Sequence, residues 1–371
     1  MLSGPRASGG ADNRTRIRTV VVGGGQAGLA VGFYLTRHRI PFVILDANDR
    51  TGDSWRRRWD SLRLFTPAWS SSLPGMPFPA PRRSYPTKDD VADYLEAYAE
   101  RYKLPIRRGV RVDRVSRENG VFQVQAGGEI HQADHVIVAM SSHQVPRVPP
   151  FASELNPAIA QLSSTGYRNP AQLAEGPVLV VGAHDTGAEV ALESAAGHRT
   201  WLAGRYPGQV PFRIDGPVGR WLGVPLVMFM FHRVLSVRNP LGRRMSAEMH
   251  RHAGPVVRIK NKDLEAAGVE RVPRVVGVRD GFPLLDDGNV LEVATVIWCT
   301  GFEPDLSWID LPITPDDSSE PHHERGIVAS EPGLYFVGLF FQSAASSGLL
   351  RGVGRDAEWI VDSIRSDPAI R

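Results

Sequence analysis

Two stretches of the chain share one pattern, in which a run of apolar, β-branched residues leads through glycines into small and apolar residues at helical spacing. The first stretch predicts a strand over residues 18–22, a helix over 29–37 and a second strand over 41–45. The second stretch predicts strands over 177–181 and 200–203 on either side of a helix. A strand, a helix and a parallel strand within about 30 residues form a βαβ unit, so the pattern predicts an α/β fold.

The pattern between and after these two units predicts further strands and helices. Thr87 to Asp90 has the form of a capping box, with Asp in place of Glu, and predicts a helix through about Tyr102. The apolar stretch from Trp221 to Leu235 predicts a helix that could belong to the core, to an interface or to a lid over a site. The remaining predicted elements are strands over 110–115, 121–124, 135–139, 272–278 and 291–299, and a last helix over 358–364.

The order of these elements predicts how the chain is divided. Residues 1–16 are rich in Gly, Ser and Arg without periodicity and predict a disordered tail. One domain is assigned to 17–150 and 292–371. A second domain, over 151–291, is inserted into the first and carries a helical insert at about 206–260.

Composition and charge exclude several classes of protein. Apolar residues make up 42% and charged residues 22% of the 371 residues, as in globular proteins with a buried core. The single cysteine, Cys299, excludes a disulfide scaffold, and no grouping of His, Asp and Glu has the spacing of a metal site. The arginines are scattered apart from Arg56 to Arg58, so we do not expect nucleic-acid binding. We expect no signal peptide and no membrane span, which predicts a cytoplasmic protein. A homodimer is the candidate assembly, and the sequence leaves the oligomeric state open.

The first glycine loop, Gly23 to Gly28, has the form GxGxxG between a strand and a helix. In a dinucleotide site the first glycine allows a tight turn, Gly25 lets the backbone approach a pyrophosphate, and Gly28 lets the helix pack against the strand. The first helical turn, with Gln26 and Ala27, offers free N–H groups to that pyrophosphate. Asp46 ends the second strand, where a carboxylate can accept hydrogen bonds from ribose hydroxyls. The sequence therefore predicts a dinucleotide site in a Rossmann-like domain.

The second glycine loop, 182–187, keeps the outer glycines but has His184 at the second glycine position, where a side chain should obstruct the pyrophosphate. Asp185 is expected to cap its own helix and to place a carboxylate where a phosphate would bind. Arg205 follows the return strand, where NADP sites use an arginine for the 2′-phosphate. The alternative is a domain that keeps this architecture without binding a nucleotide. The candidate NADPH-binding residues are Gly182, His184, Asp185, Thr186, Gly187 and Arg205.

Longer segments outside the two loops point to one family. These are Gly52–Trp55, Trp59–Pro67, Tyr85–Leu95, Val296–Asp305, Pro332–Gly338 with Gln342, and Gly352–Ala357. Together they resemble the flavin-containing monooxygenases, which are single-chain (class B) flavoprotein monooxygenases, here in a short bacterial form. The resemblance covers nearly all of residues 18–365 and implies two Rossmann-like domains of the glutathione-reductase type, with FAD and NADPH as cofactors.

The resemblance also implies site residues and a reaction. Arg63 and Gln342 are the polar candidates for catalysis beside the flavin ring. In such enzymes NADPH reduces the flavin, and the reduced flavin reacts with O2 to a C4a-(hydro)peroxyflavin that oxygenates a small molecule. Further residues implied to line FAD are Ser54, Trp55, Thr66, Val112, Thr300, Gly301 and Gln342.

The departures from the family pattern are on the NADPH side. Ser153 stands where the family fingerprint after Phe151 has glycine, Ser163 stands where relatives often carry histidine, and His184 interrupts the second loop. Two other functions therefore remain open: a flavin oxidase or dehydrogenase that does not use NADPH in the usual way, and a flavin-binding protein without turnover. A thioredoxin-reductase-like function needs two cysteines and is excluded.

Overall fold

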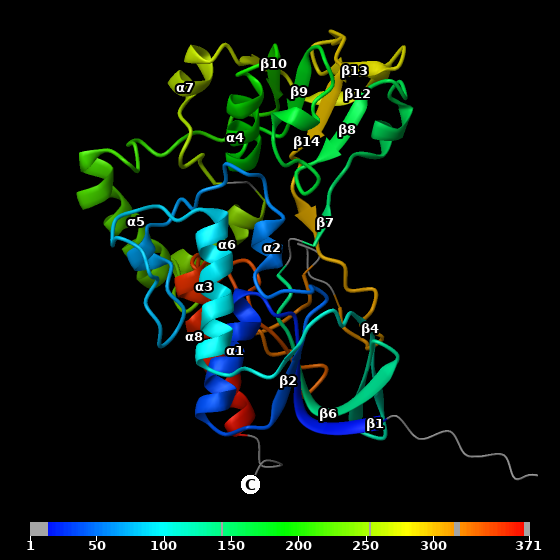
Figure 1. Cartoon of the computed structure of the whole chain (residues 1–371), viewed down its shortest axis with the longest axis vertical. Helices are drawn as coiled ribbons and strands as arrows, with labels where there is room; N and C mark the ends of the chain where they lie inside the picture. Colours follow the sequence, from blue (N-terminus) through cyan, green and yellow to red (C-terminus); the bar gives the residue numbers. More distant parts are fainter. Residues whose placement is uncertain (1–13, 142–143, 252–253, 315–319, 367–371) are drawn as a thin grey trace, which may run out of the picture.

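The computed structural model of the chain describes residues 14–141, 144–251, 254–314 and 320–366. Its two large sheets lie at opposite ends of a long molecule (Figure 1). The chain enters the larger sheet first, then forms the smaller sheet, and returns to the larger sheet with its last strand and helix. This α/β fold, with a second domain inserted into the first, is the fold predicted from the sequence.

The larger sheet is parallel in its centre and antiparallel at one edge. Its strands lie in the order β3-β2-β1-β6-β5-β4, and the last strand of the chain, β16, pairs with the end of β6. The pairs β1–β2, β1–β6 and β2–β3 are parallel, whereas β4–β5 and β5–β6 are antiparallel. The strands are β1 (Arg14–Val22), β2 (Phe42–Leu45), β3 (Ile106–Arg107), β4 (Val112–Glu118), β5 (Val121–Ala126), β6 (Glu129–Val138) and β16 (Leu334–Phe336).

The apolar runs in β1 and β2 reflect burial on both faces of this sheet. Val21 and Ile44 pack against the helices, whereas their neighbours Val20 and Val43 pack into a second cluster on the opposite face. Successive strand residues point to opposite faces, so a run without polar residues is expected in such a strand. The helices on the first face are α1 (Gln26–Arg37), α3 (Lys88–Arg101) and α8 (Leu350–Arg365).

The predicted capping box at the start of α3 is present. Asp90 donates its backbone N–H to Thr87 Oγ1 at 3.1 Å, and Thr87 donates its backbone N–H to Asp90 Oδ2 at 2.8 Å. These two bonds satisfy N–H groups that the first helical turn leaves without an intrahelical partner.

The smaller sheet is entirely parallel and is covered by α4 (Asp185–Ser194) and α7 (Asn261–Ala266). Its strands, in order, are β11 (Glu270–Val272), β10 (Thr200–Ala203), β9 (Val178–Val181), β14 (Thr295–Trp298) and β8 (Ala160–Ser163). Because β14 pairs with β9 and β8, residues 295–298 belong to this sheet. The prediction that residues from 292 onward belong to the first domain is therefore wrong over this strand.

Two crossings of the chain connect the sheets. Residues of β7 (Val145–Pro146) and β15 (Phe302–Glu303) form a short antiparallel pair midway between them (Figure 1). Shorter elements outside the two large sheets are a hairpin of β12 (Val275–Arg279) and β13 (Phe282–Leu285) and the single turn α2 (Asp53–Arg56). Further 3₁₀ turns lie at Ala68–Ser70, Pro150–Glu154 and Pro170–Gln172.

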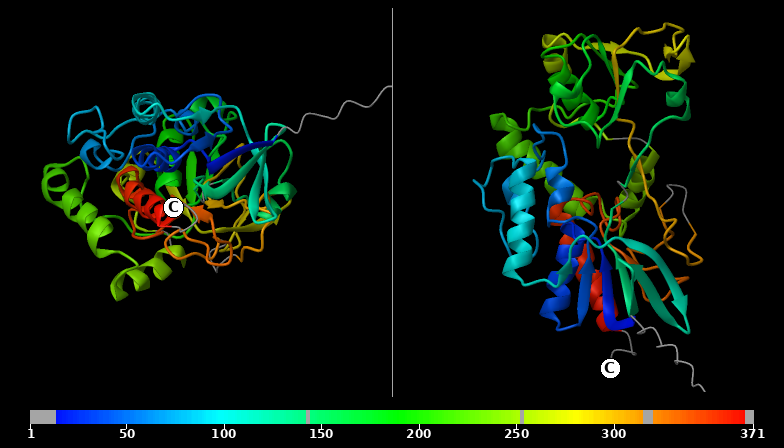
Figure 2. Two further views of the ribbon diagram at one scale, coloured as in Figure 1. Left: turned by 90° about the horizontal axis from the view of Figure 1, so that it is seen from below. Right: turned by 45° about the vertical axis from the view of Figure 1, so that its right-hand side comes forward.

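The helical insert projects from the side of the molecule, where it forms a nearly continuous helix from Gly219 to Val234 that includes α5 (Val224–Phe229), followed by α6 (Pro240–Arg251) (Figure 2). Its inner face packs Val224 and Met228 against Phe65 and Tyr85 of the first domain. Its outer face exposes Trp221 and Phe229. The insert is therefore anchored on the flank of the first domain, although the sequence places it within the second.

Several element boundaries differ from the prediction, among them β6, which begins at Glu129 and not at His135. Strand β1 begins at Arg14, so residues 14–16 belong to a strand and not to the predicted tail, and residues 1–13 lie outside the described part of the chain. The strand predicted over 272–278 is divided into β11 and β12 at Pro273, which has no N–H for a ladder bond. Helix α8 begins at Leu350, before the predicted start at Glu358.

The close approach of α1 to β1 leads to a stability prediction. A Cβ atom at Gly28 would lie 1.9 Å from the carbonyl oxygen of Gly23, whereas a Cβ atom at Gly25 would meet nothing within 4 Å. We expect Gly28→Ala to lower the unfolding free energy by about 2 kcal/mol or more, because the helix must move away from the strand. The matched variant Gly25→Ala should unfold like the wild type in the apoprotein. Chemical unfolding of both variants measures this, and equal stability of the two would contradict it.

Candidate active site

The first glycine loop leads into α1, whose N-terminus offers backbone N–H groups that no side chain caps. Gly23 has a φ of +105°, which L side chains rarely adopt, and its N–H donates to Leu45 O at 2.8 Å, which joins the loop to β2. Gly25 precedes α1, no side chain caps this end of the helix, and its first turn has no acidic residue. The space beside Gly25 is open, so the backbone at this point can approach a bound group closely. The loop therefore fits a pyrophosphate at a helix N-terminus.

Asp46 lies beside this loop at the carboxyl end of β2, as predicted. Its Oδ1 accepts hydrogen bonds from the backbone N–H of Asn48 at 3.2 Å and from Asn48 Nδ2 at 3.0 Å. Burial raises the pKa of the Asp46 carboxyl, and these hydrogen bonds oppose the increase. The carboxylate borders the same cavity as the glycine loop, so it can accept hydrogen bonds from a ribose.

A cavity of about 710 Å³ begins at this loop and extends to the crossings between the two domains. Arg58 and Trp59 line its middle, and Phe340 lines it on the C-terminal side. Trp55 donates its indole N–H to Gln26 Oε1 at 3.3 Å, which joins the segment after β2 to the start of α1. The predicted FAD-binding residues that line the cavity are Gly23, Gly25, Gln26, Ala27, Asp46, Ser54, Trp55 and Val112.

Arg58 is a candidate that the sequence reasoning did not single out. It belongs to the run Arg56 to Arg58, whose only signal in the sequence is a cluster of positive charge. Arg56 pairs with Asp53 and Glu96 on α2 and α3, whereas Arg58 lines the cavity. Burial lowers the pKa of its guanidinium, which still remains charged, and Arg58 forms no ion pair with the described carboxylates. It therefore brings an uncompensated positive charge to the cavity.

The side chain of Gln342 has a structural role, which contradicts its prediction as a catalytic residue. Its Oε1 accepts from the backbone N–H of Gly338 at 3.0 Å and of Leu339 at 3.3 Å. Its Nε2 donates to the carbonyl oxygens of Phe336 at 2.9 Å and Arg325 at 3.2 Å. Because Gln342 is buried and these bonds occupy its amide, it orders the turn that brings Gly338 to the cavity and has no group left for catalysis.

The other predicted residues outside this cavity are also explained by local contacts. Thr66 is buried and its hydroxyl bonds to Ser71 Oγ at 3.0 Å. The hydroxyl of Thr300 donates to the carbonyl oxygen of Arg147, and the backbone N–H of Arg147 donates to the carbonyl oxygen of Gly301 at 2.9 Å. Thr300 and Gly301 therefore stabilise the crossing between the domains. Arg63 lies in a separate cavity and not beside the predicted flavin, so its placement does not support a catalytic role there.

The second glycine loop repeats the backbone of the first. Gly182 has a φ of +112°, and a Cβ atom at Gly187 would lie 1.7 Å from the carbonyl oxygen of Gly182, as at Gly28 and Gly23. Thr186, in the first turn of α4, lines the same cavity as the first loop. The start of the second helix therefore borders the cleft that the first loop borders. Arg205 is exposed just after β10, where a 2′-phosphate would be bound.

The side chains of His184 and Asp185 hold the segment that follows α6. His184 Nε2 donates to Gly254 O at 2.6 Å, and Asp185 Oδ1 accepts from the backbone N–H of Val257 at 2.7 Å. Helix α4 has no side-chain cap at its N-terminus, so the prediction that Asp185 caps its own helix is wrong. The contact joins residues about 70 positions apart, which no local pattern in the sequence indicates.

An acidic face of α4 continues this contact. Glu189 lies one turn after Asp185, and Arg258 donates to Glu189 Oε1 at 3.2 Å and to the carbonyl oxygen of Arg63 at 3.1 Å. Burial raises the pKa of Glu189 to about 7 although Arg258 opposes the increase. Burial also raises the pKa of Asp185. Arg258 therefore connects α4 to Arg63 of the first domain.

Neither thiol nor metal chemistry is indicated by the described residues. Burial raises the pKa of the Cys299 thiol to about 12, so it is not a nucleophile near neutral pH. Within residues 14–141, 144–251, 254–314 and 320–366, no group of three His, Cys, Asp or Glu residues could hold a metal ion. The same part of the chain has no helix that is both long and apolar enough to span a membrane.

Comparison with known proteins agrees with this geometry. Residues 20–207 match the family described as "Pyridine nucleotide-disulphide oxidoreductase". An "Uncharacterized oxidoreductase CzcO-like" from Geobacillus kaustophilus is 38% identical and covers 94% of this chain and 98% of its own. Indole-3-pyruvate monooxygenase YUCCA1 from Oryza sativa is 30% identical, with 86% of each chain covered. The structure is similar to a flavin-containing monooxygenase from Stenotrophomonas maltophilia, with a TM-score of 0.77, 28% identity, and 95% and 98% of the two chains covered.

The raised pKa of Glu189 gives a pH prediction. Between about pH 4.5 and 7 the folded state keeps a proton that the unfolded chain has released, so this group makes the unfolding free energy fall as pH rises. The glutamine side chain of Glu189→Gln cannot ionise. Across this range the unfolding free energy of the variant should therefore fall by about 2 kcal/mol less than that of the wild type.

Chemical unfolding at several pH values measures this difference. Glu265→Gln is the matched control, because Glu265 is exposed on α7. Parallel pH curves for the wild type and Glu189→Gln would contradict the assignment.

Proposed function

The chain belongs to the pyridine nucleotide-disulphide oxidoreductase family, among its flavin-containing monooxygenases, and we propose that it uses FAD and NADPH to transfer one oxygen atom from O2 to a small organic molecule. In this reaction NADPH, a proton, O2 and the substrate give NADP⁺, water and the oxygenated substrate. The observation that carries the proposal is that both glycine loops border one cavity, because Gly23 to Ala27 and Thr186 all line it.

The residues around the cavity have distinct roles in holding FAD. The first turn of α1 binds the diphosphate, and Asp46 accepts hydrogen bonds from the adenosine ribose. Trp55 and Phe340 provide apolar surface, and the Arg58 guanidinium provides positive charge toward a reduced, anionic ring. When bound, FAD accepts a hydride and, once reduced, activates O2 for transfer to the substrate. The protein excludes water from the cavity between the domains and holds the reactants together.

The second loop is assigned to NADPH. The N-terminus of α4 has no side-chain cap and faces the cleft, which suits a diphosphate. Arg205 is exposed beyond β10, where it can pair with the 2′-phosphate of NADPH. Its neighbours Gly204 and Tyr206 are not acidic, and an acidic residue there would favour NADH. The contacts of His184 and Asp185 with residues 254–257 favour the second candidate, a flavin oxidase or dehydrogenase, because those residues lie over the loop that must receive NADPH.

Anaerobic reduction distinguishes these functions. Mixing FAD-loaded protein with NADPH in the absence of O2 should bleach the visible absorbance of the flavin, and added O2 should restore it. NADH, which lacks the 2′-phosphate, should act with about tenfold weaker apparent affinity. Arg205→Gln should remove most of that difference, because the guanidinium no longer pairs with the phosphate.

The other outcomes identify the alternatives. Failure of NADPH to bleach the flavin, with bleaching by an organic substrate, would contradict the proposal and identify an oxidase or dehydrogenase. A flavin that neither NADPH nor any substrate reduces would identify a binding protein without turnover.

The His184 side chain gives a further prediction. His184→Gly removes the imidazole from the loop and its bond to Gly254, so NADPH should bind about three- to tenfold more tightly. Equilibrium titration with NADPH measures the change. His198→Gly is the matched control. His198 also donates to a backbone carbonyl oxygen, that of Gly176, but it lies beyond the C-terminal end of α4, away from the glycine loop. An unchanged or weaker affinity in His184→Gly would mean that the imidazole does not obstruct the nucleotide.

A further inference from the structure

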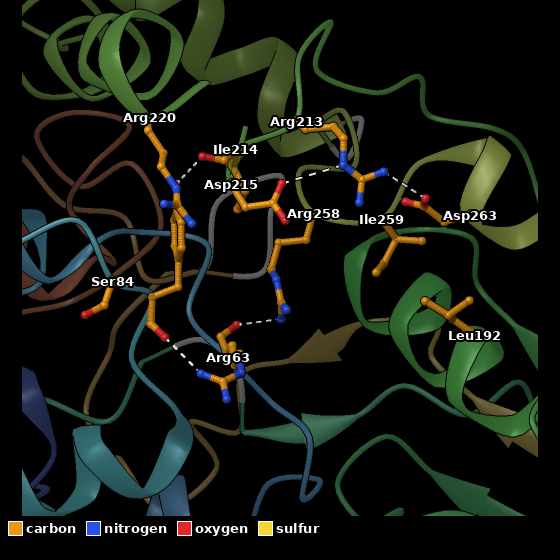
Figure 3. Close-up of a pocket in the computed structure, with 11 residues that line it drawn as sticks. Arg63, Ser84, Leu192, Arg213, Ile214, Asp215, Arg220, Arg258, Ile259 and Asp263 are labelled. Carbon is orange, nitrogen blue, oxygen red and sulfur yellow. Dashed lines mark hydrogen bonds and ion pairs between the residues drawn. The ribbon is translucent and has the colours of Figure 1, made fainter. Parts of the chain in front are cut away.

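A second cavity, of about 560 Å³, lies apart from the one bordered by the glycine loops (Figure 3). Three parts of the chain that are distant in sequence form its walls. The first domain contributes residues 63 and 84–85, the helical insert contributes residues 213–220, and the second domain contributes Leu192 and residues 258–263. Neither glycine loop contributes to it.

The lining of this cavity carries an excess of positive charge. The guanidinium groups of Arg63, Arg213, Arg220 and Arg258 surround it, against only two carboxylates, those of Asp215 and Asp263. Both carboxylates pair with Arg213, whose Nη1 lies 2.8 Å from Asp263 and whose Nε lies 3.6 Å from Asp215. The lining therefore carries a formal charge of about +2, the four arginines less the two carboxylates. Arg258 is paired with Glu189 at 3.2 Å, so the excess charge belongs to Arg63 and Arg220.

Arg63 and Arg220 are the least satisfied of these cations. Neither forms an ion pair with any carboxylate of the described residues, and the Arg63 guanidinium donates a long hydrogen bond, 3.4 Å, to the carbonyl oxygen of Tyr85. Both side chains are exposed to the cavity and to solvent. Their N–H groups remain available for an oxyanion, and charge-assisted bonds of this kind are among the strongest in proteins.

Hydrogen bonds between the three walls hold the cavity in shape. Tyr85 donates its hydroxyl to Ile214 O at 2.5 Å, which fastens the insert to the first domain. Arg258 donates to Arg63 O at 3.1 Å, which fastens the second domain to the first (Figure 3). Within the second domain, Arg258 also donates to Glu189 Oε1 at 3.2 Å. A ligand would therefore meet a wall that is already ordered, which lowers the entropic cost of binding.

The remaining lining is apolar. Leu192, Ile214 and Ile259 line the cavity together with Tyr85. Apolar surface does not stabilise a bare inorganic ion, whereas an organic anion would bury its carbon skeleton against it.

We propose that this cavity is a binding site for a small organic anion. A carboxylate or phosphate group pairs with Arg63 and Arg220, with Arg258 behind them, and the carbon skeleton packs against Ile214 and Ile259. Leu62 and Phe65, the neighbours of Arg63, line the other cavity, so the segment 62–65 forms a common wall. A ligand here is consequently held beside the cofactor cavity, either as an effector or as the anionic end of a substrate.

Calorimetric titration of the FAD-loaded protein tests the proposal without requiring turnover. The probes are benzoate, its neutral counterpart benzamide, and inorganic phosphate, at constant ionic strength and up to about 10 mM. We expect saturable binding of benzoate, weaker binding of phosphate, which lacks the apolar part, and no binding of benzamide. Higher salt should weaken the binding of benzoate, because the cavity is open to solvent.

Variants assign the binding to this cavity. Arg63→Gln and Arg220→Gln should each weaken benzoate binding by about tenfold or more. The matched control is Arg233→Gln, since Arg233 is exposed on the same helical run as Arg220 but does not line the cavity. Thermal unfolding checks that each variant is folded, as expected for exposed side chains.

Each result decides the proposal. Absence of benzoate binding, equal binding of benzamide, tighter binding of phosphate than of benzoate, or equal loss in Arg233→Gln would each overturn it. The two sources of the anion are distinguished by steady-state NADPH oxidation. Benzoate that competes with the substrate indicates the anionic end of a substrate, and benzoate that changes the rate without competing indicates an effector.

Discussion

The contact between a helix and the strand before it constrains both halves of this molecule. At Gly28 against Gly23, and again at Gly187 against Gly182, the helix lies so close to the loop carbonyl that no Cβ atom fits between them. The first turns of α1 and α4, which carry these helices' free N–H groups, have no side-chain cap. Both helix ends then border one cleft, where a diphosphate can replace the missing caps. The position of the cofactors and the function proposed for the cleft depend on this arrangement.

Local patterns in the sequence were sufficient where neighbouring residues decide the structure. The βαβ units, the first glycine loop and the capping box of Thr87 and Asp90 are all formed within a few residues, and they were predicted correctly. Pairing between distant strands was not predictable in this way. The four residues of β14 are all buried, which suits the centre of either sheet, and only the contact with β8 and β9 decides between them. The predicted last helix starts at Glu358, yet α8 begins at Leu350, and Gly352 is required there because a Cβ would lie 1.7 Å from Ser346 O.

The functional residues also divide into those that local sequence predicts and those that depend on contacts between distant segments. Gly23, Gly25 and Asp46 line the cavity because backbone geometry alone places them there. Gln342 was assigned to the flavin through the family resemblance, but four hydrogen bonds to backbone groups occupy its side chain. The roles of Arg58 and Arg258 depend on contacts between distant segments. Arg58 lines the cavity between the domains, and Arg258 bonds to Arg63 and Glu189. A sequence shows that such residues exist but not which carboxylate or cavity they meet.

The central claim is that the N–H groups at the start of α1 bind the diphosphate of FAD. Titration of the flavin-free protein with FAD and with FMN, followed by the quenching of flavin fluorescence, tests it most directly. FMN carries the same ring but lacks the diphosphate bridge and the adenosine. We expect one FAD bound per chain and an affinity for FMN that is weaker by about 100-fold or more. Equal affinity for the two flavins, or a folded protein that binds neither, would contradict it.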